Sequence, residues 1–141
     1  MNSKEAKKSY VETHNLKKSG IRRFINSVKF SLDGLHHAYL HEQSLTILLI
    51  ATILVIVTGI TFNATPMQWI IILVMMSIIM VAELFNTAIE AVVDMVTQEY
   101  NEYARIAKDT ASAAVFIASL TAFGMWLAVF GTKIVNVIFG K

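Results

Sequence analysis

Four polar side chains recur at helical spacing in an otherwise apolar stretch: Glu83, Asn86, Glu90 and Asp94. At about 100° per residue they fall within about 80° of arc, along about 16 Å of one helix face. Such a stripe suits two kinds of chemistry. Aligned carboxylates hold a divalent cation, and a carboxylate withdrawn from water is a stronger general base. A carboxylate near mid-membrane costs at least about 2.5 kcal/mol, so Glu83 is expected to face protein or water.

The residues alone also allow this stripe a purely structural role. The helix could leave the membrane near residue 82, or the polar groups could only join helices together. Intramembrane acids also occur in non-enzymatic proton or cation pathways. A structural assembly subunit is a further alternative.

Lys108 and Asp109 stand just before the next apolar stretch. Asp109 or Thr110 is expected to cap the following helix. Lys108 is expected to act either as a counter-ion for the row of acids or as a phosphate ligand near a helix N-terminus.

Three histidines, His36, His37 and His41, precede Glu42, and the spacing of the last two histidines is compatible with a metal ion. Ordinary residues at a membrane surface are the simpler interpretation of this group. Cysteine is absent, which excludes disulfides, a thiolate nucleophile and cysteine metal ligands.

The elements that must position these groups are membrane helices. The 141 residues are 55% hydrophobic and 16% charged, which is outside the usual soluble range. Residues 43–82 lack charge over a helical length of about 60 Å, two hydrocarbon thicknesses, and Asn63 to Pro66 predicts a hairpin within them. A second uncharged run covers 110–132. We therefore predict an all-α fold that crosses the membrane at about 45–62, 67–94 and 110–131.

The part of the chain before the first crossing divides into two segments. Residues 1–19 are polar and predict a mobile tail, whereas 21–41 have an apolar face at helical spacing and predict an amphipathic surface helix. Residues 20–141 would form one membrane domain. Eight basic residues precede the first crossing, so the N-terminus and the 94–109 loop are expected to be cytoplasmic. Lys133 and Lys141 mildly oppose this topology.

Small side chains predict close packing of the third crossing. Ala111, Ala114, Ala118 and Ala122 fall on nearly one helix face, which permits another helix to approach closely. Trp126 is compatible with an anchor near the outer membrane surface.

The run Glu83-Leu-Phe-Asn86-Thr-Ala-Ile-Glu90-Ala-Val-Val-Asp94, with Ala107-Lys108-Asp109-x-Ala-Ser112-Ala-Ala-Val, closely resembles the prokaryotic diacylglycerol kinase family. The resemblance extends from about residue 23 to about residue 129. It implies a homotrimeric kinase of the bacterial inner membrane, with active sites between protomers, that transfers the γ-phosphate of MgATP to a lipid hydroxyl. The sequence has no Gly-rich phosphate loop or protein-kinase signature, so general motifs alone would not indicate a nucleotide enzyme.

The resemblance also implies roles for individual residues. Glu83 corresponds to the general base and also contacts the lipid substrate, Asn86 and Asp94 support the catalytic site, and Ser112 contacts the lipid. Glu42 and Glu90 correspond to the ligands of Mg²⁺. The implied nucleotide-contacting positions are Arg23, Phe30, Glu42, Glu90, Glu99, Lys108 and Asp109.

Two departures concern the lipid acceptor. Phe30 stands where the proteobacterial enzymes have tyrosine, and Ile47-Leu48 stand where they have a polar Gln-Glu pair. Members of the family from Gram-positive bacteria often phosphorylate undecaprenol. The expected acceptor is therefore diacylglycerol, giving phosphatidic acid, with undecaprenol, giving undecaprenyl phosphate, as the alternative.

Overall fold

The computed structural model describes residue 4 and residues 20–140, apart from the side chain of His41. The expected polar tail, 1–19, lies outside the described residues except for Lys4. The regular elements are α2 (Ile21–His41), α3 (Gln43–Thr61), α4 (Pro66–Val96) and α5 (Glu102–Phe139). No strand occurs among the described residues, so the all-α prediction is confirmed. Contacts divide the chain into two compact units, residues 1–40 and 41–141.

The first unit contains α2, whose bounds agree with the predicted surface helix at 21–41. Its large apolar side chains include Phe24, Ile25 and Leu32, all of which are exposed. An exposed apolar face opposite a basic one is typical of a helix that lies in the headgroup region. That location remains a prediction.

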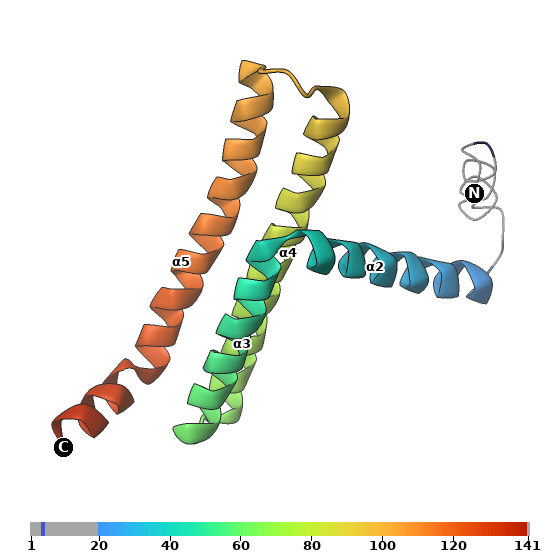
Figure 1. The fold of residues 1–141 in the computed structure, drawn as a ribbon. Coiled ribbons are helices and arrows are strands. Elements are labelled where there is room, and N and C mark those ends of the chain that lie inside the picture. Colours follow the sequence, from blue (N-terminus) through green and yellow to red (C-terminus); the bar gives the residue numbers. More distant parts are fainter. Residues whose placement is uncertain (1–3, 5–19, 141) are drawn as a thin grey trace. The chain divides into compact units, whose positions relative to one another are not determined.

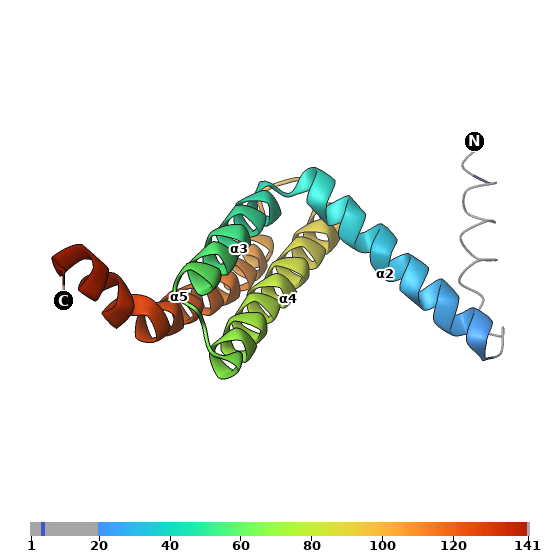
Figure 2. The same ribbon diagram turned by 90° about the horizontal axis from the view of Figure 1, so that it is seen from below.

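The second unit is a bundle of α3, α4 and α5 (Figures 1 and 2). Each helix is long and apolar enough to cross a membrane, as predicted, and the chain is therefore a membrane protein. α4 packs against both neighbours, more extensively against α5 than against α3. Figure 1 shows that α3 accompanies only one half of α4, whereas α5 runs along both halves. The other half of α4, which α3 does not accompany, carries the C-terminal part of the polar stripe.

The predicted hairpin between the first two crossings is confirmed. α3 ends at Thr61, and Asn63 takes a positive φ of 48°, a conformation that asparagine tolerates better than most residues. Thr65 then caps α4: its hydroxyl accepts a hydrogen bond from the Gln68 backbone N–H, and the Gln68 side chain accepts one from the Thr65 N–H. Pro66 occupies the first helical turn, where its missing N–H costs nothing.

Gly59 allows α3 and α4 to approach closely beside this hairpin. A Cβ atom at Gly59 would lie 2.7 Å from Cη2 of the Trp69 indole, closer than real carbon contacts. We expect Gly59→Ala to lower the free energy of unfolding by about 1–3 kcal/mol, because the rigid indole must move. Gly124→Ala is the matched control, since a Cβ atom at Gly124 would meet nothing within 4 Å and alanine favours the helix. Thermal unfolding in one detergent compares them, and equal melting temperatures for the two variants would contradict this packing.

The start of the last helix differs from the prediction. We expected the third crossing to begin near residue 110, with Asp109 or Thr110 as its cap; instead α5 begins at Glu102. The side chain of Asn101 is the cap, accepting hydrogen bonds from the Tyr103 and Ala104 N–H groups at 2.9 and 3.2 Å. The polar residues before 110 thus extend the apolar helix by about 12 Å. Asp109 consequently lies within α5 and cannot cap it.

Lys133, which opposed the predicted topology, has a structural partner. Its ammonium donates a hydrogen bond of 2.9 Å to the carbonyl oxygen of Phe62, at the C-terminal end of α3. The same nitrogen lies 5.9 Å from the ring centroid of Phe130, a fully buried side chain. A cation at a helix C-terminus is favourable. Lys133 therefore joins α5 to the end of α3, which accounts for a basic residue at this end of the bundle.

The row of alanines on α5 is only partly buried. Ala111 and Ala122 are buried and Ala118 is half-buried, which agrees with the expected close approach to α4, but Ala114 is exposed. The prediction that these alanines allow close helix packing therefore agrees with the structure at three of the four positions.

Candidate active site

Glu83 is the buried charged side chain among the described residues, with 8% of its surface exposed. It lies on α4 and faces the first turn of α3, where the Ser44 hydroxyl donates a hydrogen bond of 3.1 Å to Glu83 Oε2. The carboxylate therefore faces protein, as the cost of exposing it to lipid requires.

The helix lengths are consistent with a position of Glu83 near one edge of a hydrocarbon layer. α3 has 19 residues and is therefore about 28 Å long, close to the thickness of about 30 Å that it must cross. The contact with Ser44 sets Glu83 at the level of the first turn of α3. Glu83 also comes about 26 Å along α4 from Pro66, which gives the same depth. The depth of this carboxylate in the membrane remains a prediction.

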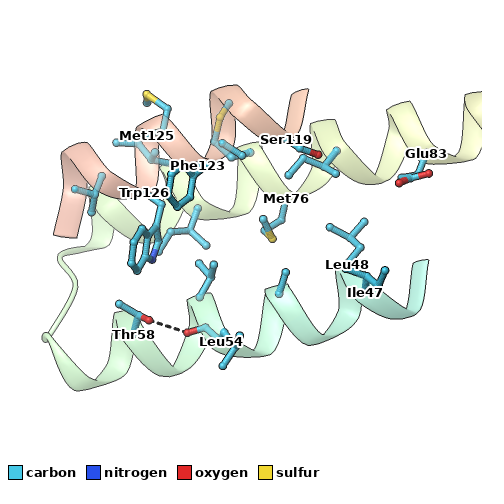
Figure 3. Close-up of a pocket in the computed structure, with 18 of the residues that line it drawn as sticks. Ile47, Leu48, Leu54, Thr58, Met76, Glu83, Ser119, Phe123, Met125 and Trp126 are labelled. Atoms are coloured by element: carbon cyan, nitrogen blue, oxygen red, sulfur yellow. Dashed lines mark hydrogen bonds between the residues drawn. The ribbon is translucent and has the colours of Figure 1, made fainter. Parts of the chain in front are cut away.

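Glu83 and Ser44 also line a cavity of about 370 Å³ between α3, α4 and α5. Figure 3 shows Glu83 at one end of the labelled group and Trp126 with Thr58 towards the other. The lining between them is almost entirely apolar, and Ile47 and Leu48 lie on the α3 side. An apolar cavity with a buried carboxylate at one end suits a ligand that has a long apolar part and a polar end.

The stripe continues from Glu83 to Asn86 and Glu90, which are in direct contact. The Asn86 amide nitrogen donates a hydrogen bond of 3.0 Å to Glu90 Oε1, and both side chains are half-buried. The amide oxygen Asn86 Oδ1 and the hydroxyl Thr87 Oγ1 are buried without a hydrogen-bond partner. Buried oxygens of this kind are normally satisfied. In the middle of the stripe, the oxygen Asn86 Oδ1 is therefore free to accept a hydrogen bond or bind a cation next to the Glu90 carboxylate.

The far end of the stripe forms an ion pair with α5. Lys108 Nζ lies 2.6 Å from Asp94 Oδ1, so the expectation that Lys108 is a counter-ion of the acids is confirmed. Asp94 comes about 42 Å along α4 from Pro66, a distance greater than the thickness of about 30 Å of a hydrocarbon layer. The hydrogen bond to Asp94 raises the pKa of Lys108 above its ordinary value, with a smaller contribution from the charge of Glu90. The Lys108 ammonium is therefore charged at neutral pH and loses its proton only as the pH rises into the alkaline range.

The remaining candidate residues are spread over both units. Arg23 and Phe30 lie on α2, in the first unit. Glu42 directly precedes α3 and makes no side-chain capping bond. In the second unit Glu99 and Ser112 are exposed, and Asp109 forms an ion pair of 2.8 Å with Arg105 one turn earlier on α5.

The donor set fits a hard divalent cation such as Mg²⁺, although the structure does not assemble a complete metal site. Within the described part of the chain, no group of three or more His, Cys, Asp or Glu side chains could hold a metal. The oxygens of Glu90 and Asn86 are the ligand type that Mg²⁺ prefers, and one or two carboxylates with phosphate oxygens complete its usual site. The free Asn86 Oδ1 is consistent with this. The histidine site gains no support from the described residues, and the side chain of His41 lies outside them.

Sequence reasoning missed four polar residues at the cavity: Ser44, Thr58, Ser119 and Trp126. Ser44 lies 39 residues from Glu83, so no helical period connects them. Trp126 was interpreted as an interfacial anchor, yet it lines the cavity and its indole Nε1 is buried without a partner. Only the packing of α3 and α5 against α4 identifies these positions.

The geometry defines a class of protein: a helical membrane protein with a buried carboxylate at the end of an apolar cavity and a polar stripe that continues from it along the same helix. Residues 29–130 match the family model of the prokaryotic diacylglycerol kinases. The chain belongs to this prokaryotic diacylglycerol kinase family.

Curated relatives agree with the family match. Diacylglycerol kinase of Escherichia coli K12 is 32% identical over 108 residues, covering 77% of this chain and 88% of the relative. Diacylglycerol kinase of Haemophilus influenzae is 34% identical over 102 residues, covering 72% and 86%. The Helicobacter pylori enzyme of the same name is 29% identical over 115 residues, covering 82% and 87%.

The protein is accordingly an enzyme, a lipid kinase that acts on a lipid substrate in a bilayer, and kinase membership indicates a nucleotide co-substrate. Because the chain belongs to a kinase family, neither a non-enzymatic proton or cation pathway nor a structural assembly subunit is needed to explain the stripe.

Proposed function

We propose that the protein transfers the γ-phosphate of ATP to the hydroxyl of diacylglycerol, giving phosphatidic acid. The observation that carries the proposal is the burial of Glu83 at the end of an apolar cavity. A lipid whose chain lies in the cavity brings its hydroxyl to this carboxylate. Its phosphate donor reaches the same point from the aqueous side.

Glu83 is the proposed general base. It accepts the proton of the lipid hydroxyl while that oxygen forms a bond to the γ-phosphorus, and the bond from the γ-phosphorus to the β,γ-bridging oxygen breaks, releasing ADP. One Oε2 lone pair is engaged by Ser44, which leaves Oε1 for the acceptor. Phosphoryl transfer needs little covalent participation from the protein, so positioning and charge neutralisation supply most of the catalysis.

The rest of the stripe is the proposed phosphate side of the site. Glu42 and Glu90 would hold Mg²⁺, with Asn86 ordering Glu90 through their hydrogen bond. When bound, Mg²⁺ neutralises charge on the phosphates and helps to align them. Asp94 supports the site by holding Lys108. The remaining proposed nucleotide contacts are Arg23, Phe30, Glu99, Lys108 and Asp109, and Ser112 is the proposed lipid contact.

Lys108 is proposed to pair with phosphate when ATP binds. We expect Lys108→Gln to raise the KM for ATP about 10-fold or more, the effect of losing a charge-assisted hydrogen bond. Its melting temperature should change little, because exposed ion pairs contribute little to stability. Steady-state kinetics at saturating lipid measure the effect. Lys133→Gln, at the opposite end of α5, should keep the wild-type KM for ATP, and an unchanged KM in Lys108→Gln would exclude the phosphate contact.

The protein is proposed to be a homotrimer in the bacterial inner membrane, with its N-terminus and active site cytoplasmic. Many large apolar side chains of α3, α4 and α5 are exposed in the single chain, including Phe85, Phe116 and Phe123. Contact with lipid or with further copies would cover them. A site shared between protomers would also bring charged groups of one copy to the half-buried stripe of another.

The acceptor is tested with purified protein in nanodiscs, labelled ATP and Mg²⁺. We expect diacylglycerol to be phosphorylated with a higher kcat/KM than undecaprenol. Undecaprenol is the second candidate because Ile47 and Leu48, which stand where the proteobacterial enzymes have a polar pair, make the cavity more apolar. Preferred labelling of undecaprenol would replace the proposed acceptor, and absence of labelling of either lipid would refute the proposed function.

A further inference from the structure

Ser44 is the hydrogen-bond partner of Glu83 in the described structure, and the family resemblance assigned it no role. Its hydroxyl lies 3.1 Å from Glu83 Oε2 in a part-buried position. No cation forms an ion pair with Glu83 among the described residues. A carboxylate with so little exposure depends on the few donors that it has, because water cannot replace them freely.

The position of Ser44 in α3 makes this contact notable. Serine near a helix N-terminus commonly serves the free backbone N–H groups of the first turn. Glu42 is the N-cap residue here and forms no side-chain capping bond, yet the Ser44 hydroxyl donates across to α4 instead of remaining within its own helix. The other serine hydroxyls with described bonds, those of Ser31 and Ser77, donate to the carbonyl four residues earlier in their own helix.

The contact also leaves the two oxygens of Glu83 in different surroundings. Ser44 uses one lone pair of Oε2, and both residues line the cavity, so Oε1 keeps more of its acceptor capacity for an approaching hydroxyl. A glutamate has three rotatable side-chain bonds and loses reactivity if its carboxylate samples several orientations. One hydrogen bond from a separate helix restrains that rotation and ties the carboxylate to the depth of the first turn of α3.

We propose that Ser44 is a positioning residue that orients the Glu83 carboxylate towards the hydroxyl of the lipid acceptor. This inference rests on the proposed role of Glu83 as the base. Ser44 does not itself exchange a proton with substrate. Its loss should therefore slow transfer without weakening ATP or metal binding.

The test compares Ser44→Ala, Ser44→Thr and the control Ser77→Ala in nanodiscs at saturating Mg²⁺. We expect Ser44→Ala to lower kcat about 10-fold, the effect of one hydrogen bond to a charged group, with an unchanged KM for ATP. Ser44→Thr retains the hydroxyl and should recover most of the activity. Ser77 is exposed and lies on α4 six residues before Glu83, so Ser77→Ala should match wild type.

Two further readouts separate positioning from other effects. The Mg²⁺ concentration for half-maximal activity should not change in Ser44→Ala, whereas an effect through nearby Glu42 would raise it. Circular dichroism and melting temperature identify a folding defect. Wild-type kcat in Ser44→Ala, or a loss that threonine fails to restore, would overturn the inference about Ser44 while leaving the lipid kinase intact. An inactive wild-type protein would instead refute the proposed function itself.

Discussion

Glu83→Gln is expected to lower the rate of lipid phosphorylation about 10²- to 10⁴-fold, the usual contribution of a general base. The amide keeps the size of the side chain, and its oxygen can still accept the hydrogen bond from Ser44, so the fold should persist. It cannot take the proton of the acceptor hydroxyl at neutral pH. The fall should therefore appear in kcat, measured with labelled ATP at saturating lipid and Mg²⁺.

Glu102→Gln is the matched control for this substitution. Glu102 is also a carboxylate on a long helix of the bundle, but 69% of its side chain is exposed and it lies in the first turn of α5. Its removal should leave kcat close to wild type. A folded Glu83→Gln protein that transfers phosphate within a few-fold of the wild-type rate would exclude Glu83 as the base.

Glu90→Gln is expected to act on metal binding. Removing one negative ligand should raise the Mg²⁺ concentration needed for half-maximal activity about 10-fold or more. Excess Mg²⁺ should then restore much of the activity, because the base and the lipid cavity remain. The measurement is a Mg²⁺ titration of the initial rate at fixed ATP.

The two carboxylate variants thus have different expected signatures. A high Mg²⁺ concentration should restore the activity of Glu90→Gln but not that of Glu83→Gln, although both residues lie on one face of α4. If the Mg²⁺ dependence of Glu90→Gln equals that of wild type, Glu90 is not a metal ligand. If Mg²⁺ restores Glu83→Gln instead, the two assigned roles are reversed.

Much of the fold follows from the sequence because each feature has a local cause. Two uncharged runs, the first divided by a hairpin, predict three crossings, and the residues from Asn63 to Pro66 predict the hairpin that the Thr65 cap and Pro66 form. The stripe on α4 follows from spacing alone, since a continuous helix fixes the angle between its residues.

The parts that the sequence did not predict depend on contacts between helices. The beginning of α5 was misplaced because the charged segment before residue 110 lacks an apolar period, although Asn101 is a good cap and the helix begins at Glu102. That extension brings Lys108 to Asp94. The contact of Ser44 with Glu83 likewise arises only when α3 packs against α4.

Burial explains why one carboxylate of the stripe differs from the others. Glu83 is covered by α3, whereas Glu90 is half-buried and Asp94 is exposed beside Lys108, on the half of α4 that α3 does not accompany (Figure 1). The same side-chain type thus experiences three environments along one helix. This gradient supports the assignment of the base to the buried end and of phosphate and metal to the hydrated end.

The central claim is that the lipid hydroxyl meets Glu83 at the end of the apolar cavity. A diacylglycerol analogue with a photoreactive diazirine next to its hydroxyl tests it most directly, with crosslinked residues identified by mass spectrometry. The account predicts labelling of Glu83 and its neighbours at that end of the cavity, including Ser44 and Leu48, and competition by unlabelled diacylglycerol. Competed labelling confined to Trp126 and Thr58, with none near Glu83, would contradict it.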